Sequence, residues 1–558
     1  MRVAVVPTGE GGAWTRELAE DGQPLGEPRL WTDLPVAVAA YEPSGPRWVW
    51  AHTMDIYPRL LAAGVRVERC HDVELTETLL MGYVGRWGSP RSVAAAWARL
   101  TGGPVPPDKA PRSRDTQPTL FDAEQADPLG GADPLEVLLA VHADQLRRIG
   151  ETALPGRFRL LVAAESAGAL AAAEMGHVGL PWRADVHSEL LTEMLGPRQA
   201  YGLPPRKLGE LSERAALALG DRKLHLDSPA EVLKAFSRAG IRLSSTRSWV
   251  LKEVDHPAVP LLLEYKELYR IYTAHGWAWL SAWVHDGRFR PEYVPGGVVS
   301  GRWATRGGGA LQIHKRVRRA AIADPGWVLV VADAGQLEPR VLAALSGDEK
   351  LARAGASGDL YRALADEAFG GDRPRAKIGM LAALYGQTSG EAGVLVAALR
   401  RKFPRAVDHV EKAAQIGESG GLVRSWLGRT CPPATSGWVE GGLDPEPVEE
   451  ASDSGARNRA RGRFTRNFVV QASAADWALA LLATLRTALT GIGVEGARPE
   501  LVFFQHDEVI VHCRAEDAAE VTAVLEQAAE TAGRVVFGDT PARFPLDIAA
   551  VECYADAK

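Results

Sequence analysis

The clearest pattern of apolar and polar positions in the chain lies between Leu501 and Cys513, in LVFFQHDEVIVHC. Two runs rich in β-branched and aromatic residues flank the polar sequence QHDE, which predicts a strand, a tight turn and a second strand. The turn carries two adjacent carboxylates, Asp507 and Glu508. Such neighbours repel each other and gain nothing from burial. Their presence at a hairpin tip therefore needs a chemical reason.

A second pattern begins with a buried strand at Val328–Val331, within GWVLVVADAGQLEPRVLAALSG, and leaves that strand at Asp333. A helix should follow, because apolar residues recur at four-residue spacing, at Leu337, Val341 and Leu345. An aspartate at a strand exit and another at a hairpin tip are suited to meet across a sheet. Two such carboxylates can hold a pair of divalent metal ions for phosphoryl transfer. Taken alone, Asp333 fits equally well as a helix N-cap.

The third pattern is a helical stripe in DRPRAKIGMLAALYGQ. Arg373, Lys377, Leu381 and Tyr385 recur every four residues, and Gly386 provides a stop. Two cations one turn apart would bind a triphosphate, and the aromatic ring could stack on a base. The alternative is an ordinary amphipathic helix with a basic end.

The rest of the chain divides into regions of different pattern. Residues 1–110 show short strands among helical stretches, residues from about 135 to 283 read as mainly helical, and strands and helices mix after 284. Leu261–Trp283 reads as one long helix. Two segments rich in proline, glycine and acidic residues are predicted to be flexible, a linker at Pro111–Pro134 and a loop at Pro432–Ala456.

Composition narrows the class of protein. A chain of 558 residues is too long for one core, and 46% hydrophobic with 24% charged residues is ordinary for a soluble protein. No uninterrupted apolar run approaches the roughly 18 residues of a membrane span, and the N-terminus lacks signal-peptide features. The four cysteines lie far apart, which argues against a disulfide framework or zinc site. We therefore expect a cytoplasmic monomer with no membrane contact.

Although the net charge is −6, the chain contains three basic clusters, at His314–Arg319, Arg400–Arg405 and Arg457–Arg466. Any one of them reads most simply as a solvated helix face. Three clusters flanking the carboxylate patterns favour a partner with a phosphate backbone.

In order along the chain, the aspartate strand, the R-x₃-K-x₇-YG helix and the H-D-E hairpin resemble motifs A, B and C of the family A DNA polymerases. SGRWATRGGGALQIH, at Ser300–His314, is similar to that family's T-G-R-x-S-S…L-Q-N segment. WLGRT and the later RGRFTRNFVVQASAADW are similar to its G-R-R…R-x₃-N-x₃-Q-G-x-A-A-D block. The resemblance covers about residues 228–558.

The resemblance implies an α/β and α+β multidomain protein, with an RNase H-like exonuclease-type domain at residues 1–150 and a right-hand polymerase at 151–558. The thumb would span about 151–283, the palm about 284–345 and 467–558, and the fingers about 346–466 with the acidic loop 432–456. Primer-template DNA and dNTPs would be its partners.

The resemblance also implies roles for single residues. Asp333 and Asp507 would hold two Mg²⁺ ions, for which Mn²⁺ could substitute, and Glu508 would support them. Nucleotide contacts fall to Arg373, Lys377, Leu381, Tyr385, Gln336 and Glu338, with Glu338 screening the 2′ position of the sugar. Primer-template contacts fall to Arg302, Gln312, Gln336, Arg463, Asn467, Gln471 and His506.

Several positions depart from the family pattern. Motif A has Ala334 and Gly335 where an aromatic residue and a hydroxyl are usual, motif B has Leu381 in place of an aromatic ring, and Ala472 replaces a glycine. The two aspartates, the two cations and Tyr385 are kept, which favours activity.

The N-terminal region is similar to the family's proofreading 3′–5′ exonuclease, with Asp55 and Asp144 matching two of its metal-binding aspartates. Pro7 and Gly9 stand where its first acidic pair belongs, and Ala140 stands where a tyrosine is expected. The two aspartates therefore read more readily as surface residues of a degenerate domain.

The leading function is template-directed DNA synthesis. A single-subunit RNA polymerase shares the two aspartates and the R…K…YG helix, although the N-terminal domain counts against it. A non-catalytic DNA-binding relic should lack one of the aspartates, and both are present.

Overall fold

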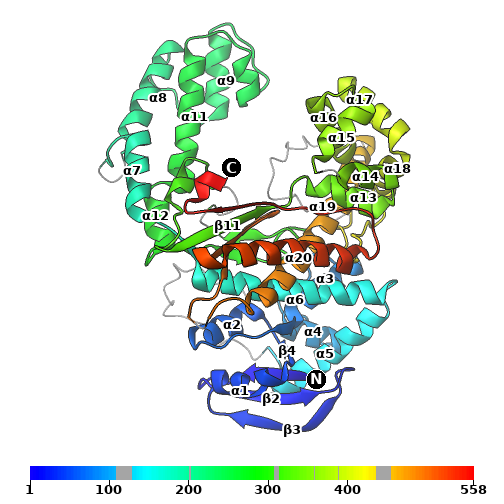
Figure 1. Ribbon diagram of the computed structural model, residues 1–558. Helices are drawn as coiled ribbons and strands as arrows, with labels where there is room; N and C mark the ends of the chain where they lie inside the picture. The colour runs from blue at the N-terminus through cyan, green and yellow to red at the C-terminus, as the bar shows by residue number, and fades with distance from the viewer. Residues whose placement is uncertain are drawn as a thin grey trace. The chain divides into compact units, whose positions relative to one another are not determined.

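The computed structural model describes residues 1–557, apart from residues 109–127, 200–202, 307, 308, 310–312, 357, 388, 435–453 and 495. The chain forms two compact units. Unit 1 contains Met1–His177, Tyr293–Ala304 and Ala332–Ile548, and unit 2 contains Val178–Glu292, Thr305–Val331 and Ala549–Lys558. Most of the two segments predicted to be flexible falls outside the described residues. Figure 1 shows the mixture of sheets and helices that the sequence predicts.

The N-terminal part of unit 1 is built on a five-stranded sheet with the order β3-β2-β1-β4-β5. Its strands are β1 (Arg2–Pro7), β2 (Ala13–Leu18), β3 (Pro24–Trp31), β4 (Arg47–Trp50) and β5 (Arg69–Asp72). Strands β1, β4 and β5 run parallel, whereas β2 pairs antiparallel with β1 and β3. The sheet is therefore mixed, and it lies in the region where the sequence shows short strands among helical stretches.

Helices cover both faces of this sheet because successive side chains of a strand point to opposite sides. Val3 and Val5 pack into the core formed with α1 (Leu34–Tyr41) and α2 (Thr53–Ala62). Ala4, between them, packs into the opposite core. The helices of that second core are α3 (Val73–Tyr83), α4 (Val93–Thr101) and α5 (Pro134–Gly150).

Helix α6 (Pro155–Val178) joins this sheet to the rest of unit 1. Leu170 and Ala173 lie in the first core, and Glu174 accepts a hydrogen bond of 2.5 Å from the hydroxyl of Tyr57. Glu174 also pairs with the buried guanidinium of Arg486. These contacts place α6 in unit 1, and unit 2, which carries the following helices, begins at residue 178. The thumb boundary near residue 151 stays a prediction.

Arg486 fixes this junction through its remaining donors. Its Nη1 donates to the carbonyl oxygen of Glu68 at 2.5 Å and its Nη2 to that of Val67 at 2.7 Å. Arg66 adds an exposed ion pair of 2.7 Å with Glu500. We call Tyr57, Glu174 and Arg486 the buried junction.

A four-stranded sheet follows, with the order β12-β13-β11-β14. Its strands are β11 (Trp327–Asp333), β12 (Glu500–Gln505), β13 (Glu508–Arg514) and β14 (Asp547–Val551). The predicted hairpin is confirmed, because β12 and β13 pair antiparallel and Gln505 faces Glu508 across the turn.

The remaining helices of unit 1 surround the motif segments. They are α13 (Leu337–Ser346), α14 (Glu349–Ala356), α15 (Leu360–Ala368), α16 (Arg373–Tyr385), α17 (Gly390–Lys402), α18 (Pro404–Glu418), α19 (Ser454–Leu489) and α20 (Ala518–Phe537). Of the described helices, only α19 is long and apolar enough to cross a membrane, and 89% of its most apolar window is buried inside the structure. Such burial is typical of a core helix.

Unit 2 is mainly helical, as predicted. It contains α7 (Ala184–Leu195), α8 (Arg206–Ala218), α9 (Pro229–Arg238), α10 (Ser248–Lys252), α11 (Ala258–His275) and α12 (Trp277–Trp283). Its short strands β6 (Leu180–Pro181), β7 (Val284–His285) and β8 (Arg288–Phe289) form a small sheet. A separate two-stranded sheet, not confined to unit 2, pairs β9 (Glu292–Val294) with β10 (Ala304–Arg306).

The single helix predicted for Leu261–Trp283 is wrong. The chain breaks at Gly276, whose backbone is extended and where a Cβ atom would lie 2.3 Å from the carbonyl oxygen of Tyr272. Only glycine fits that close approach. Because the apolar periodicity continues across Gly276, the sequence pattern does not indicate that the helix is interrupted there.

Candidate active site

The two aspartates of the strand and the hairpin lie at the same end of one sheet. Strands β11 and β13 are neighbours, and the backbone N–H of Ala334 donates to the carbonyl oxygen of Asp507 at 2.9 Å. Asp333 ends β11, whereas the N-cap of α13 is Gln336, so Asp333 does not cap that helix. The structure thus places the two aspartates that the sequence predicted to meet at the same end of neighbouring strands.

Glu508 begins β13 directly after Asp507, and its side chain is buried. Asp333 and Asp507 are only half-buried. Solvent and ligands can therefore reach the two aspartates, whereas the side chain of the glutamate is enclosed.

The donor set suits Mg²⁺. Within the described part of the chain, no group of three or more His, Cys, Asp or Glu residues could hold a metal ion. Mg²⁺ commonly binds to one or two carboxylates and completes its shell with water and substrate phosphates. Asp333 and Asp507 fit that pattern.

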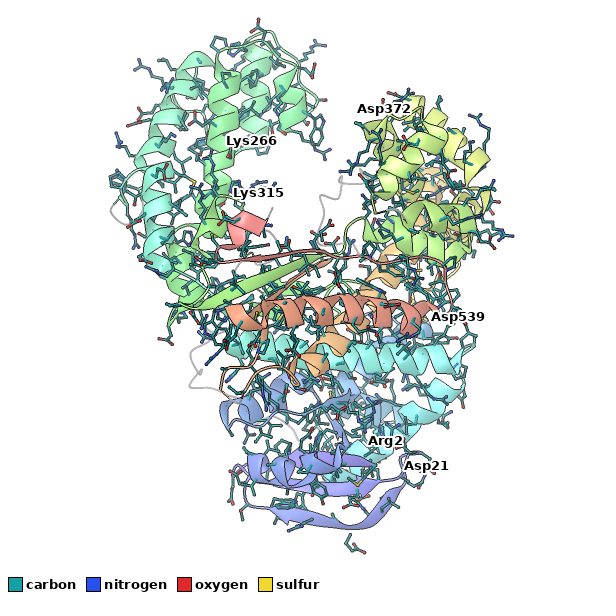
Figure 2. All side chains as sticks on the ribbon, viewed as in Figure 1. Arg2, Asp21, Lys266, Lys315, Asp372 and Asp539 are labelled. Carbon is teal, nitrogen blue, oxygen red and sulfur yellow. The ribbon has the colours of Figure 1, made fainter. Side chains whose placement is uncertain are left out.

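The cationic stripe lies on α16, which starts after its N-cap Asp372 (labelled in Figure 2) and ends at Gly386 with a φ of 75°. Arg373, Lys377 and Tyr385 are exposed and Leu381 is half-buried. The buried residues of the helix include Ala376, Met380, Ala383 and Leu384, which lie beside the stripe. Three of the four stripe residues nevertheless remain exposed.

Arg373 already has an anionic partner, which the sequence did not reveal. Its Nε lies 2.6 Å from Oδ2 of Asp359, and Nε2 of Gln336 donates to Oδ1 of the same carboxylate at 2.8 Å. Gln336 also accepts a hydrogen bond of 2.8 Å from the N–H of Leu360. Burial acts to raise the pKa of Asp359, but the hydrogen bonds from Arg373 and Gln336 outweigh it and lower the pKa. The position of Asp359 before a helix could have marked it as an N-cap, but not as the partner of Arg373.

Glu338 is the centre of a second cluster. Nη2 of Arg302 lies 2.6 Å from one of its carboxylate oxygens, and the hydroxyl of Tyr385 donates to the other at 3.5 Å. Burial and the charge of Glu338 raise the pKa of Tyr385, which also hydrogen-bonds with Gln471. Four segments thus place predicted nucleotide and primer-template residues side by side.

The other predicted primer-template residues lie on α19 and at the hairpin turn. Arg463 is exposed on α19, and Oδ1 of Asn467 is buried without a hydrogen-bond partner among the described residues. His506 lies at the hairpin turn with a φ of 58°, and its pKa is lowered by desolvation and by the charge of Arg302. Gln312 lies outside the described residues.

The two possible exonuclease residues do not come together. Asp55 is exposed in the first turn of α2, which follows the carboxyl end of β4. Asp144, on α5, forms ion pairs of 2.6 Å with Arg147 and 3.3 Å with Arg148 and lines a cavity at the opposite, amino-terminal end of the parallel strands. The pairing of Asp55 with Asp144 that the resemblance implied is therefore not supported by their positions.

The carboxyl ends of β4 and β5 instead hold a different acidic group. Asp72, fully buried, caps α3 and lies 3.4 Å from the imidazole of His52. Burial raises the pKa of nearby Glu74 to about 7. Sequence reasoning missed these residues, because a strand that ends in an aspartate also reads as an ordinary helix cap.

The family model for DNA polymerase family A matches residues 205–550, more than half of the chain. The chain belongs to DNA polymerase family A. This membership confirms the resemblance drawn from the three motifs.

Relatives within DNA polymerase family A are similar over about half of the chain. DNA polymerase I of Chloroflexus aurantiacus is 28% identical over 333 residues, or 54% of this chain and 33% of the relative. The thermostable DNA polymerase I of Thermus filiformis is 29% identical over 316 residues, or 52% of this chain and 35% of the relative. The chain thus matches about a third of the length of these curated relatives.

A solved structure shares the fold over the whole chain. It is the POL domain of Pol1 from M. smegmatis in complex with DNA primer-template and dNTP, at 18% sequence identity and a TM-score of 0.69. The similarity covers 100% of this chain and 96% of that one. The fold class expected from the sequence is therefore confirmed.

Proposed function

We propose that this family A protein is a template-directed DNA polymerase that adds dNTPs to the 3′ end of a primer. The observation that carries the proposal is the meeting of Asp333 and Asp507 at one end of a sheet. The exposed cations of α16 and the DNA polymerase I relatives support it.

Asp333 and Asp507 would hold two Mg²⁺ ions, with Mn²⁺ as a substitute, and Glu508 would support them from its buried position. When bound, such ions stabilise the attacking and leaving oxygens of phosphoryl transfer. The half-buried aspartates leave room for the phosphates that complete the metal shell.

The protein's own residues bind and orient the reactants. Arg373 and Lys377 bind the triphosphate, and Tyr385 lies under the templating base pair. Leu381 and Glu338 border the sugar. Contacts to the primer-template come from Arg302, Gln312, Gln336, Arg463, Asn467, Gln471 and His506. Positioning of this kind supplies much of the rate enhancement in phosphoryl transfer.

The N-terminal domain is proposed to lack proofreading, because Pro7 and Gly9 replace its first acidic pair and Asp55 and Asp144 lie apart. We further infer that the enzyme acts as a monomer in the cytoplasm, in DNA repair or replication, since primer-template DNA is its substrate.

Primer extension with the purified full chain tests this proposal. A labelled primer on a longer template is incubated with dNTPs in Mg²⁺ and, separately, in Mn²⁺, and we expect extension to the end of the template. A parallel reaction with rNTPs alone separates a DNA polymerase from an RNA polymerase, which would extend only with rNTPs. A protein that binds primer-template but extends it with neither metal would be the non-catalytic relic.

A further inference from the structure

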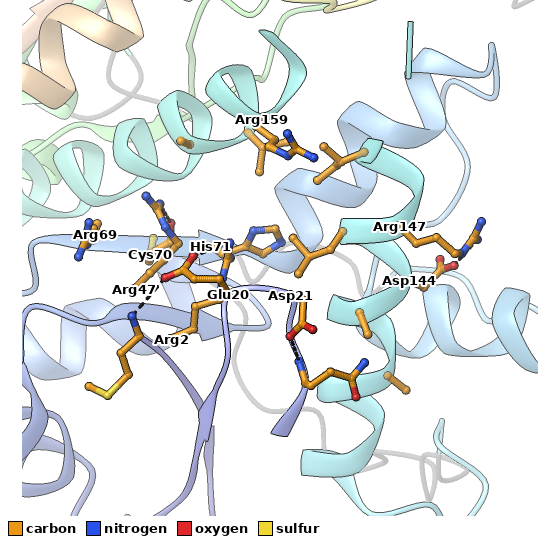
Figure 3. Close-up of a pocket in the computed structure, with 18 of the residues that line it drawn as sticks. Arg2, Glu20, Asp21, Arg47, Arg69, Cys70, His71, Asp144, Arg147 and Arg159 are labelled. Atoms are coloured by element: carbon orange, nitrogen blue, oxygen red, sulfur yellow. Dashed lines mark hydrogen bonds and ion pairs between the residues drawn. The ribbon is translucent and has the colours of Figure 1, made fainter. Parts of the chain in front are cut away.

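A cavity of about 920 Å³ lies in the N-terminal part of unit 1, where the parallel strands β1, β4 and β5 begin (Figure 3). This volume is within the range of about 300–1,000 Å³ that small-molecule sites occupy. None of the proposed polymerase residues lines it. It lies at the opposite end of the strands from Asp55, and of the two residues matched to the exonuclease only Asp144 lines it.

Three arginines stand side by side on the strand side of this cavity. Arg2 pairs in register with Arg47, and Arg47 with Arg69. Arg47 donates to the carbonyl oxygen of Cys70 at 3.1 Å and Arg69 to that of Gly45 at 2.6 Å, so their charges are not neutralised by these bonds. Arg2 has one distant carboxylate, Glu20, at 3.8 Å. The three positive charges are therefore crowded together.

The crowding of these charges also affects the pKa values of the arginines. Burial lowers the pKa of Arg47, and the charges of Arg2 and Arg69 lower it further. Burial and the charge of Arg69 also lower the pKa of Arg2, against the effect of Glu20. Arginine stays protonated at neutral pH, so the repulsion persists until an anion relieves it.

The helix side of the cavity adds another cation. Arg159 of α6 is exposed at the cavity, above the strand arginines in Figure 3, and no hydrogen bond or ion pair joins it to a described residue. The carboxylates in the lining are Glu20, Asp21 and Asp144, and Asp144 is already bound to Arg147 and Arg148. Burial lowers the pKa of His71 to about 4, so this residue adds no negative or positive charge.

The rest of the helix side is aliphatic. It carries Leu100 of α4, Ala140, Ala143 and Leu146 of α5, and Val162 of α6. One wall thus offers planar guanidinium groups, which match phosphate oxygens in pairs, and the other offers an apolar surface.

We propose that this cavity binds a small phosphate-bearing anion, either inorganic pyrophosphate or a nucleoside diphosphate. The phosphates lie against Arg2, Arg47 and Arg159, and the apolar wall accommodates the base and sugar if the ligand is a nucleotide. This site is separate from the polymerase site and would bind without metal-dependent chemistry.

The test is calorimetric titration of the full chain with pyrophosphate and, separately, with dADP. The Arg373→Ala/Lys377→Ala variant is used as the background, because it removes nucleotide binding at the polymerase site. In that background we expect binding that Arg159→Glu abolishes and that Arg2→Gln weakens about tenfold or more, the usual effect of losing a charge-assisted hydrogen bond. Arg59→Gln, at an exposed arginine of α2 outside the cavity, should leave binding unchanged.

Arg159→Glu is the decisive variant, since Arg159 has no described partner and its loss should not disturb folding; an unchanged melting temperature verifies this. Tighter binding of dADP than of pyrophosphate identifies a nucleotide, and equal binding identifies the inorganic anion. The proposal is overturned if neither pyrophosphate nor dADP binds. Binding that is unchanged in the Arg159→Glu variant also overturns it. The same holds if the cavity variants weaken only the affinity for duplex DNA.

Discussion

The side chains of Arg373 and Asp359 form an ion pair, with 2.6 Å between Nε and Oδ2. Arg373 begins α16 and Asp359 caps α15, so the pair joins the starts of two helices. The cation proposed to bind the incoming triphosphate therefore already has an anionic partner. Nucleotide binding has to replace that partner.

Asp359→Asn should lower the KM for dNTPs. Asparagine caps a helix as well as aspartate does, so the substitution removes the charge and keeps the cap. Both side chains are nearly half exposed, and ion pairs of this kind contribute about 0–1 kcal/mol, which sets a limit of roughly fivefold on the effect. Steady-state incorporation of one nucleotide measures it.

Asp372→Asn is the matched control, because Asp372 caps α16 without an ion pair to Arg373. An equal fall in KM for both variants would show that the ion pair does not compete with the nucleotide.

Asp333→Ala or Asp507→Ala should abolish primer extension and leave primer-template binding nearly intact. The carboxylates hold metal ions, whereas affinity for DNA comes mainly from basic side chains on phosphates. Extension assays and DNA-binding titrations of the same preparations separate the two effects. Glu508→Ala should be milder, since its side chain lies behind the aspartates, and wild-type extension by either aspartate variant would refute the assignment.

Leu381→Phe should raise the ratio of kcat/KM for dNTPs over rNTPs, and Glu338→Ala should lower it. A flat ring would border the sugar more rigidly than leucine, and loss of Glu338 would open the 2′ side and free Arg302. Discrimination by shape is typically worth about 1–3 kcal/mol, or roughly 10- to 200-fold. Single-nucleotide incorporation measures the ratio, and an unchanged ratio in a stable Leu381→Phe variant would leave Leu381 as a core residue of its helix.

The protein should show no more than trace 3′–5′ exonuclease activity. Two-metal hydrolysis needs several converging carboxylates, and the proposed acidic residues lie at opposite ends of the sheet. Incubation of a labelled single strand with Mg²⁺ or Mn²⁺ and no dNTPs checks this. Shortening that persists in Asp507→Ala but disappears in Asp55→Ala would contradict the expectation.

Thermal stability should fall between about pH 6.5 and pH 9 because of His52. Burial acts to lower the pKa of His52, but the charge and hydrogen bond of Asp72 outweigh it and raise the pKa to about 9. A group whose folded pKa is raised stabilises fully below its unfolded pKa, near 6.5, and loses that contribution as pH rises through about 9. The shift corresponds to about 3 kcal/mol at most.

Melting temperatures of wild type and His52→Gln across this pH range test the assignment. The variant should be less stable at pH 6 and show a flatter pH dependence, whereas His285→Gln, at an exposed position, should follow wild type. A His52→Gln curve parallel to that of wild type would exclude His52 as the titrating group.

Local periodicity predicted the strand, the hairpin and the helix that carry the candidate site residues, whereas the roles of those residues came from the resemblance to family A. The strand before Asp333 and the hairpin around Asp507 each have a recognisable apolar pattern. If both belong to one sheet, only a few relative positions are possible for their ends. The stripe on α16 followed from four-residue spacing in the same way. Side-chain ion pairs between different helices produce no periodic pattern in the sequence, and the pair of Asp359 with Arg373 is the clearest example.

The features that the sequence did not reveal share a physical cause. Gly276 interrupts a helix by close backbone contact, which apolar spacing does not record. The place of Asp144 depends on which end of α5 faces which end of the sheet, and its sequence neighbours carry no information on that. The packing of α6 depends on the buried pair of Glu174 with Arg486, two residues far apart in the chain.

The buried junction has an evolutionary consequence. Arg486 of α19 uses two backbone carbonyls near β5 and the carboxylate of Glu174 to satisfy a guanidinium that is almost wholly out of water. Deleting the N-terminal domain at residues 1–150 would remove these two carbonyl acceptors and leave Glu174 as the carboxylate partner of Arg486. Leaving buried donors of a guanidinium unsatisfied costs about 1–3 kcal/mol. Natural selection can therefore preserve the fold of this domain as a brace for α19, whatever chemistry its acidic residues keep or lose.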